Sequence, residues 1–290
     1  MDSLIKKLKG PIAVLGAKGF IGHNLLTYLN KHRADVYAGT RENLWSMLDD
    51  RKPQTVFNCI GFGLRKGEIS APMMNHTNFS LTGAVLDTLI LNGFDSYIHA
   101  GSSVEYGRDL AWTAENAKLK PATPYALSKA AASMMIRYYG RELGHRVANL
   151  RLYNVYGPGE SENSFVSVVI REGRKNKLPE FGPKDLTRDF IHVDDVCRAF
   201  VYAAVNLTPD RYGQSFNVGT GIYTTLAEVA MVAKKVFRIK ELPKFTRPAG
   251  MNEPKGVWCA STGKANRCLG FAAKIGFEEG FTKMAGEVRG

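Results

Sequence analysis

Three glycines at intervals of three residues follow a short apolar run near the start of the chain. Residues 11–15 are apolar and flanked by turn residues, which predicts a buried parallel strand. Gly16 permits a tight turn, Gly19 lets the backbone approach a pyrophosphate, and Gly22 lets the next helix pack closely. The N-terminus of that helix favours phosphate binding. The predicted dinucleotide site consists of Gly16, Lys18, Gly19, Phe20, Ile21 and Gly22.

Further apolar runs predict more strands of the same sheet. They cover residues 35–39, 55–61, 96–100 and 147–153. Each run is short and bounded by turn residues, and helical patterns separate the runs, as in βαβ units. The fold class expected is therefore α/β, with a Rossmann-type doubly wound parallel sheet.

A tyrosine and a lysine lie four residues apart at the start of a predicted helix. This spacing places Tyr125 and Lys129 one turn apart on the same face. The ammonium is expected to lower the pKa of the phenol, so that Tyr125 can exchange a proton with a sugar or alcohol oxygen. The strand at 96–100 opens into a loop with Ser102 and Ser103. Ligands of open α/β sheets bind beyond the carboxyl ends of strands, so we expect these side chains to share one site.

The glycine turn and the tyrosine–lysine pair together resemble the extended short-chain dehydrogenase/reductase family. This family contains NAD(P)-dependent nucleotide-sugar epimerases, dehydratases and reductases, and the resemblance extends to about Gly280. It implies that Ser102 is a catalytic hydroxyl that acts with Tyr125 and Lys129. Ser103 is the alternative hydroxyl.

The resemblance also implies a division of the chain. Residues 1–160 would form the NAD(P)-binding Rossmann domain, with later segments at about 187–220 returning to it. Residues 161–290 would form mainly a smaller α/β substrate-binding lobe. The gap at 42–54 is too short for the additional strand that relatives often have there. A homodimer through the helix at 125–143 is a further implication.

Binding roles follow from family motifs in the second half of the chain. The motif Arg-x-x-Asn-Val-Tyr-Gly-Pro-Gly at 151–159 implies that Asn154 contacts the sugar or diphosphate. Arg188 would clamp the diphosphate, since a guanidinium matches phosphate oxygens. The implied substrate-binding residues are Ser102, Ser103, Asn154, Arg188 and Arg247. The implied residues beside the nicotinamide are Asn58, Cys59, Ile60 and Gly61, together with Tyr125 and Lys129.

The end of the second strand bears on the choice of cofactor. An NAD enzyme usually has an acid there for the ribose 2′-hydroxyl, whereas this chain has Thr40 and Arg41. An arginine suits a 2′-phosphate, so NADP(H) is favoured. Glu42 is the residue that keeps NAD(H) possible.

The residues that follow Ser102 reduce the number of reactions that the chain could catalyse. Sugar 4,6-dehydratases of the family have an Asp and a Glu there for proton transfer, whereas this chain has Ser103 and Val104. The cysteine that 3,5-epimerising synthases carry at the Val104 position is also missing. We therefore expect an NADPH-dependent reductase of a nucleotide-diphosphate 4-keto-(6-deoxy)hexose, and the alternative is an NAD-dependent nucleotide-sugar 4-epimerase. A non-catalytic dinucleotide-sensing protein is a third reading.

Composition limits the partners. The excess of 39 Lys and Arg over 27 acids suits a polyphosphate ligand, but no dense basic tract with aromatics indicates nucleic acid. No apolar run reaches the ~20 residues of a membrane span, and the N-terminus lacks a secretory pattern. Four scattered cysteines predict reduced thiols in a cytoplasmic protein and no metal site. Asp194 and Asp195 are expected to cap a helix rather than bind metal, and His192 to be structural.

Overall fold

The computed structural model describes residues 2–33, 35–63, 67–107, 112–246 and 258–286. Its centre is a six-stranded sheet in the order β2-β1-β3-β4-β5-β9, and every pairing is parallel. The strands are β1 Ile12–Leu15, β2 Val36–Gly39, β3 Thr55–Asn58, β4 Ser96–Ser102, β5 Val147–Leu152 and β9 Ser215–Val218. The chain runs outward from β1 to β2 and then continues on the other side of β1. This reversal creates the crevice at which doubly wound sheets bind ligands, and it confirms the predicted fold class.

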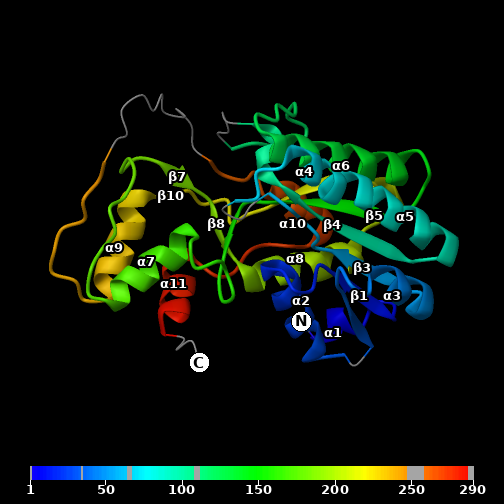
Figure 1. The fold of residues 1–290 in the computed structure, drawn as a ribbon, viewed down its shortest axis with the longest axis horizontal. Coiled ribbons are helices and arrows are strands. Elements are labelled where there is room, and N and C mark those ends of the chain that lie inside the picture. Colours follow the sequence, from blue (N-terminus) through cyan, green and yellow to red (C-terminus); the bar gives the residue numbers. More distant parts are fainter. Residues whose placement is uncertain (1, 34, 64–66, 108–111, 247–257, 287–290) are drawn as a thin grey trace.

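Helices cover both faces of the sheet (Figure 1). One face packs on α1 Asp2–Ile5, α2 Phe20–Asn30, α8 Val193–Asn206 and α10 Gly263–Leu269. The other packs on α3 Leu44–Arg51, α5 Leu81–Asn92 and α6 Pro124–Arg141. Successive side chains of a strand alternate between the two layers, so Ile12 and Val14 join one core cluster and Ala13 and Leu15 the other. Burial on both faces explains why these strands are almost continuously apolar.

Two strand boundaries matter for the site. In the described chain α3 leads directly into β3, which leaves β2 as the edge strand and confirms that the additional strand is missing. β4 extends two residues further than predicted, because Gly101 and Ser102 continue the pairing with Arg151 and Leu152 of β5. Ser102, the predicted catalytic residue, therefore lies at the carboxyl end of β4 and is still paired with β5.

A smaller lobe lies to one side of the sheet, at the left of Figure 1. Its helices are α7 Phe165–Arg174, α9 Leu226–Val236 and α11 Phe277–Gly286. β7 Thr187–Arg188 pairs antiparallel with β10 Thr224–Thr225, and β6 Asn154–Tyr156 pairs parallel with β8 Phe190–His192. The lobe has its own core, which includes Val169, Phe181, Val229 and Phe281. Tyr156 is buried in this core against Phe190, His192 and Phe277.

The remaining elements are short. α4 Ala71–Asn75 continues through a π-helical turn, η1 His76–Ser80, into α5. The three segments together form one continuous helical stretch over residues 71–92. The 3₁₀ turns are η2 Ser103–Tyr106 and η3 Pro209–Arg211.

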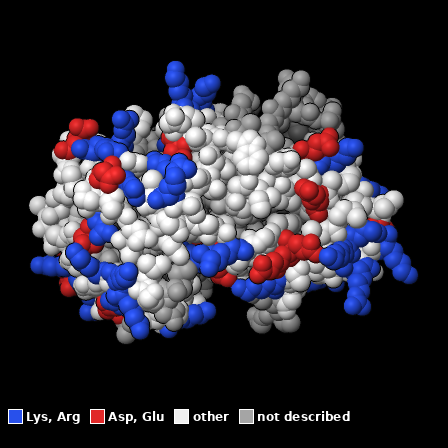
Figure 2. Space-filling view, turned by 180° about the vertical axis from the view of Figure 1, so that it is seen from behind, with Lys and Arg blue, Asp and Glu red and all other residues white. Residues whose placement is uncertain are grey.

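The charge of +12 is distributed over the molecule. On the face shown in Figure 2, Lys and Arg are scattered over both ends, with acidic residues between them. None of the helices in the described ranges combines the length and the apolar character needed to cross a bilayer.

Candidate active site

The glycine turn fits a dinucleotide sterically. Gly16 has φ +74°, and a Cβ on it would lie 2.9 Å from the backbone of Cys59. A Cβ on Gly22 would lie 2.3 Å from the Gly16 carbonyl oxygen. α2 begins at Phe20, and Gly19 provides no side-chain cap. The first N–H groups of the helix therefore remain for a pyrophosphate, as the dinucleotide site requires.

Charged residues of both signs lie at the end of β2. Lys18 of the glycine turn donates to Glu42 across 3.1 Å, and Arg41 is exposed. Hydrogen bonding from Thr40, with a smaller contribution from Lys18, lowers the pKa of Glu42 to about 2. The position thus combines cations suited to a 2′-phosphate with a carboxylate suited to a ribose hydroxyl.

The end of β3 is shaped by a buried amide. Asn58 is 1% exposed, donates to the Tyr97 hydroxyl at 2.5 Å and accepts from the Ile60 N–H at 3.0 Å. The Asn58 side chain supports the turn from its buried side. Cys59 and Ile60 are half-buried and lie against Gly16 of the glycine turn, and Gly61 is exposed. Any contact of Asn58 with the cofactor must therefore use its backbone.

Ser102, Tyr125 and Lys129 come together beyond β4. The Ser102 side chain is close enough to Tyr125 to lower the pKa of the phenol, in opposition to burial. The Lys129 ammonium is buried, donates to the Ala100 carbonyl at 3.0 Å, and lies 3.6 Å from where a Cβ on Gly61 would be. Since Cys59 and Ile60 also contact Gly16, the three groups and the glycine turn border one region.

The expected effect of Lys129 on Tyr125 is wrong in this structure. Burial raises the pKa of Tyr125 above its ordinary value, and Ser102 opposes this only in part. Burial also lowers the pKa of Lys129 to about 8, while Glu105 acts in the opposite direction. The ammonium is directed at the Ala100 carbonyl rather than at the phenol, so desolvation dominates for both groups.

Local sequence determines where α6 begins. The Thr123 side chain accepts from the Ala126 N–H at 3.1 Å, and Pro124 occupies the first turn, so Tyr125 enters the site at the helix N-terminus. Asn78, in the π-helical turn, holds the loop before the site. It bonds both the N–H and the C=O of Phe62 and donates to Ser128 of α6, each at 2.9 Å. Sequence reasoning missed this asparagine, since only the π turn directs it inward.

The predicted substrate residues lie on the side of the smaller lobe. Asn154 starts β6, where its N–H and its side chain both donate to the Asp189 carbonyl. Beside it is a hollow of about 210 Å³. The hollow is lined by Asn154, Val155, Tyr156, Glu160, Phe165, Val166 and Phe190. Arg247 lies outside the described residues.

Arg188 is a partly buried cation over an aromatic ring. Its guanidinium lies 5.4 Å from the centre of the Trp258 ring, and burial lowers its pKa. Within the described ranges no carboxylate pairs with it. The indole N–H of Trp258 donates to the Ser103 hydroxyl at 3.3 Å. Ser103 is thus occupied by Trp258, a residue that sequence reasoning missed because its partners are distant in the chain.

The aspartates at the start of α8 have structural roles. His192, not an aspartate, caps the helix by accepting from the Asp194 N–H. Buried Asp195 pairs with Arg198 and accepts the N–H groups of residues 274 and 275, each at 2.8 Å. No cluster of three or more metal-ligating side chains occurs in the part of the chain that the structure describes.

Comparisons with known proteins agree with this geometry. Residues 12–219 match the model of the NAD dependent epimerase/dehydratase family. A UDP-glucose 4-epimerase of Mycolicibacterium smegmatis is 29% identical, and the match covers 93% of this chain and 96% of the relative. A solved structure of MoeE5 in complex with UDP-glucose and NAD is 26% identical, with a TM-score of 0.82 over 95% of this chain and 97% of the other. The UDP-glucose 4-epimerase of Thermotoga maritima has the same fold, with 23% identity and a TM-score of 0.82 over 94% of this chain and 97% of the other.

Proposed function

The chain belongs to the NAD-dependent epimerase/dehydratase family, and from that premise we propose that it is a nucleotide-sugar 4-epimerase acting on a UDP-linked hexose. The observation that carries the proposal is the convergence of Ser102, Tyr125 and Lys129 beyond β4, next to a glycine turn shaped for a dinucleotide. Similarity to 4-epimerases along nearly the whole chain favours this activity over the reduction expected from the sequence.

The side chains have distinct roles in this proposal. Ser102 and Tyr125 would bind the C4 oxygen. In its phenolate form Tyr125 would accept the proton of the C4 hydroxyl as the carbonyl forms, and the resulting phenol would return that proton when the carbonyl is reduced. Lys129 would hold the cofactor ribose and would supply positive charge next to it. A bound NAD(P) supplies hydride exchange at C4, so that no net oxidation accompanies inversion.

Elimination of water is not supported. It needs an acid and a base after the catalytic hydroxyl, and those positions hold Ser103 and Val104. The nearest carboxylate in sequence, Glu105, is fully buried and ion-paired with Arg151. It is therefore not free to transfer protons to a sugar.

The nucleotide would bind on the side of the smaller lobe. Arg188 provides a guanidinium that pairs with no carboxylate of the described ranges and could bind the diphosphate, and Asn154 lines the hollow. We also propose that the protein forms a homodimer through α6.

Reduction of a 4-keto sugar is a second candidate because of the residues at the end of β2. Lys18 and Arg41 would favour the 2′-phosphate of NADPH, whereas Glu42 would favour the ribose hydroxyl of NAD. The proposal of 4-epimerisation takes NAD as the working cofactor.

One assay separates the candidates. The protein is incubated with UDP-, GDP-, CDP- and dTDP-sugars and with either NAD⁺ or NADPH. An epimerase converts UDP-glucose and UDP-galactose into each other with no net change in nicotinamide absorbance. Stoichiometric consumption of NADPH with a 4-keto sugar would instead establish the reductase, and NAD(P) binding without turnover of any sugar would refute both.

A further inference from the structure

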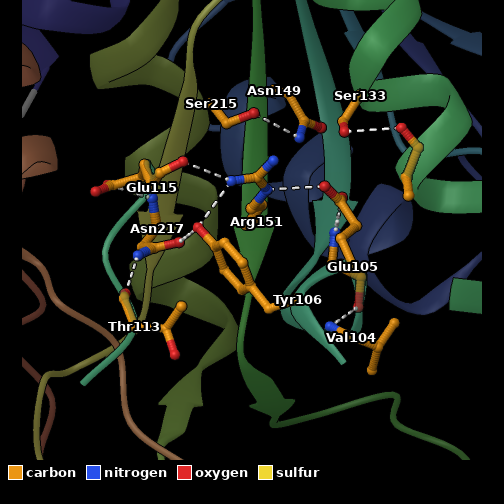
Figure 3. A network of polar contacts seen from close by, with 12 residues as sticks. Val104, Glu105, Tyr106, Thr113, Glu115, Ser133, Asn149, Arg151, Ser215 and Asn217 are labelled. Carbon is orange, nitrogen blue, oxygen red and sulfur yellow. Dashed lines mark hydrogen bonds and ion pairs between the residues drawn. The ribbon is translucent and has the colours of Figure 1, made fainter. Parts of the chain in front are cut away.

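A buried ion pair supports the loop that carries Ser102. Glu105 is fully buried in η2, and its two carboxylate oxygens have different partners (Figure 3). One accepts the Ser102 N–H at 2.9 Å, and the other accepts the Arg151 Nε–H at 2.8 Å. The carboxylate therefore joins the end of β4 to the neighbouring strand β5.

The rest of the network fixes the orientation of this pair. Arg151 donates to the Tyr106 hydroxyl at 2.8 Å, and its guanidinium lies 4.5 Å from the centre of the Tyr106 ring. Tyr106 in turn donates to Asn217 of β9 at 2.7 Å. A buried ion pair is tolerated where hydrogen bonds satisfy its remaining atoms, and these contacts leave Glu105 little freedom to rotate.

Glu105 and Lys129 hold adjacent peptide groups of β4. Lys129 donates to the Ala100 carbonyl, whereas Glu105 accepts the Ser102 N–H. Between them is Gly101, on which a Cβ would lie 2.7 Å from a Glu105 oxygen. The two oppositely charged side chains therefore bind the same short stretch of backbone, residues 100–102, which carries the Ser102 hydroxyl.

Among the residues that the structure describes, Glu105 is the one carboxylate that acts on Lys129. Burial lowers the pKa of the ammonium to about 8, and Glu105 and, more weakly, Cys59 act to raise it. His99 also faces the ammonium, but burial lowers its pKa well below the usual value, so it adds no positive charge at neutral pH. Burial raises the pKa of Tyr125.

We propose that Glu105 is a positioning residue for the reaction: its carboxylate holds the Ser102 backbone and supplies the counter-charge of the Lys129 ammonium. The inference builds on the proposed function, because it assigns a residue to the same site. Its structural part is independent of the substrate and can be tested without turnover.

The first test measures the titration of Lys129 through stability. A lysine whose pKa is lower in the folded than in the unfolded chain adds stability as the pH rises through that interval. The wild type should therefore gain stability relative to Lys129→Met above about pH 8. The same comparison is made between Glu105→Gln and Glu105→Gln/Lys129→Met. Without the Glu105 charge, the difference in unfolding free energy should begin to rise at a pH about one unit lower or more. Coincident difference curves would overturn the proposal.

The second test measures activity against pH with UDP-glucose and NAD⁺. Glu105→Gln should move the alkaline limb of kcat/KM to lower pH by a similar amount, because Lys129 deprotonates earlier. Glu115→Gln is the matched control. Glu115 accepts the Asn217 N–H at 2.9 Å in the same network but is not among the groups that act on Lys129. The alkaline limb of kcat/KM should therefore stay at the wild-type pH in Glu115→Gln. Equal shifts in both variants would also overturn the assignment.

Folding is controlled with a third variant. Removing one member of a buried ion pair is strongly destabilising, so both measurements are repeated in Glu105→Gln/Arg151→Met, which leaves no unpaired guanidinium at position 151. If no sugar is turned over by the wild type, the proposed function fails, but the stability curves still decide the role of Glu105.

Discussion

Tyr125 combines a raised pKa with a packed ring. A Cβ on Gly63 would lie 3.0 Å from the Tyr125 ring, so the ring is held against the loop after β3. Tyr125→Phe keeps this packing and removes the hydroxyl. We expect turnover to fall by about 10²–10⁴-fold, the usual loss for a general acid–base group, with unchanged affinity for NAD⁺. Turnover near that of the wild type would rule out the assignment.

Trp258 links two predicted substrate residues. It stacks beneath Arg188 and donates to Ser103. Trp258→Leu removes both contacts, whereas Trp258→Phe retains a ring below the guanidinium. Since a partly desolvated cation–π contact is worth about 1–2 kcal/mol, we expect the leucine variant to bind UDP about tenfold more weakly and the phenylalanine variant to lose much less. Titration calorimetry with UDP measures both, and equal affinities would show that the stacking is unimportant.

At the scale of elements, α6 depends on one glycine. A Cβ on Gly140 would lie 2.0 Å from the backbone nitrogen of Gly213, in the loop before β9. Gly140→Ala should therefore lower the melting temperature, although alanine favours a helix by about 1 kcal/mol. The control is Gly276→Ala, because no atom lies within 4 Å of a Cβ there. A melting temperature for Gly140→Ala at or above that of the control would contradict this close contact.

Sequence patterns located most elements, because the hydrophobic period of a helix or a strand is visible within a few residues. The strand at β4 was predicted too short, since its last two residues are polar or glycine and only pairing with β5 holds them extended. The π turn at η1 was missed for a related reason. Its deviation from the α-helix has no local pattern, but it directs Asn78 into the site.

At the scale of the whole molecule, exposed apolar side chains on α6 support a dimer. Leu127, Met134 and Tyr138 are 54%, 66% and 53% exposed, and their spacing places them on one stripe. If a second copy covers this stripe, Met134→Glu should convert the dimer to a monomer in sedimentation experiments. Met231→Glu on α9, where the side chain is 53% exposed, should not. A monomeric wild type would refute the homodimer.

The sequence by itself determined the parallel sheet, the glycine turn and the helix face that carries Tyr125 and Lys129. These features depend on the conformations of neighbouring residues, which short spacings specify. Only the tertiary structure decided that Glu105 acts on Lys129, that Trp258 contacts both Arg188 and Ser103, and that burial rather than Lys129 sets the direction of the Tyr125 pKa shift. Each of these depends on residues distant in the chain and on the removal of water around them, and desolvation is a property of the packed molecule.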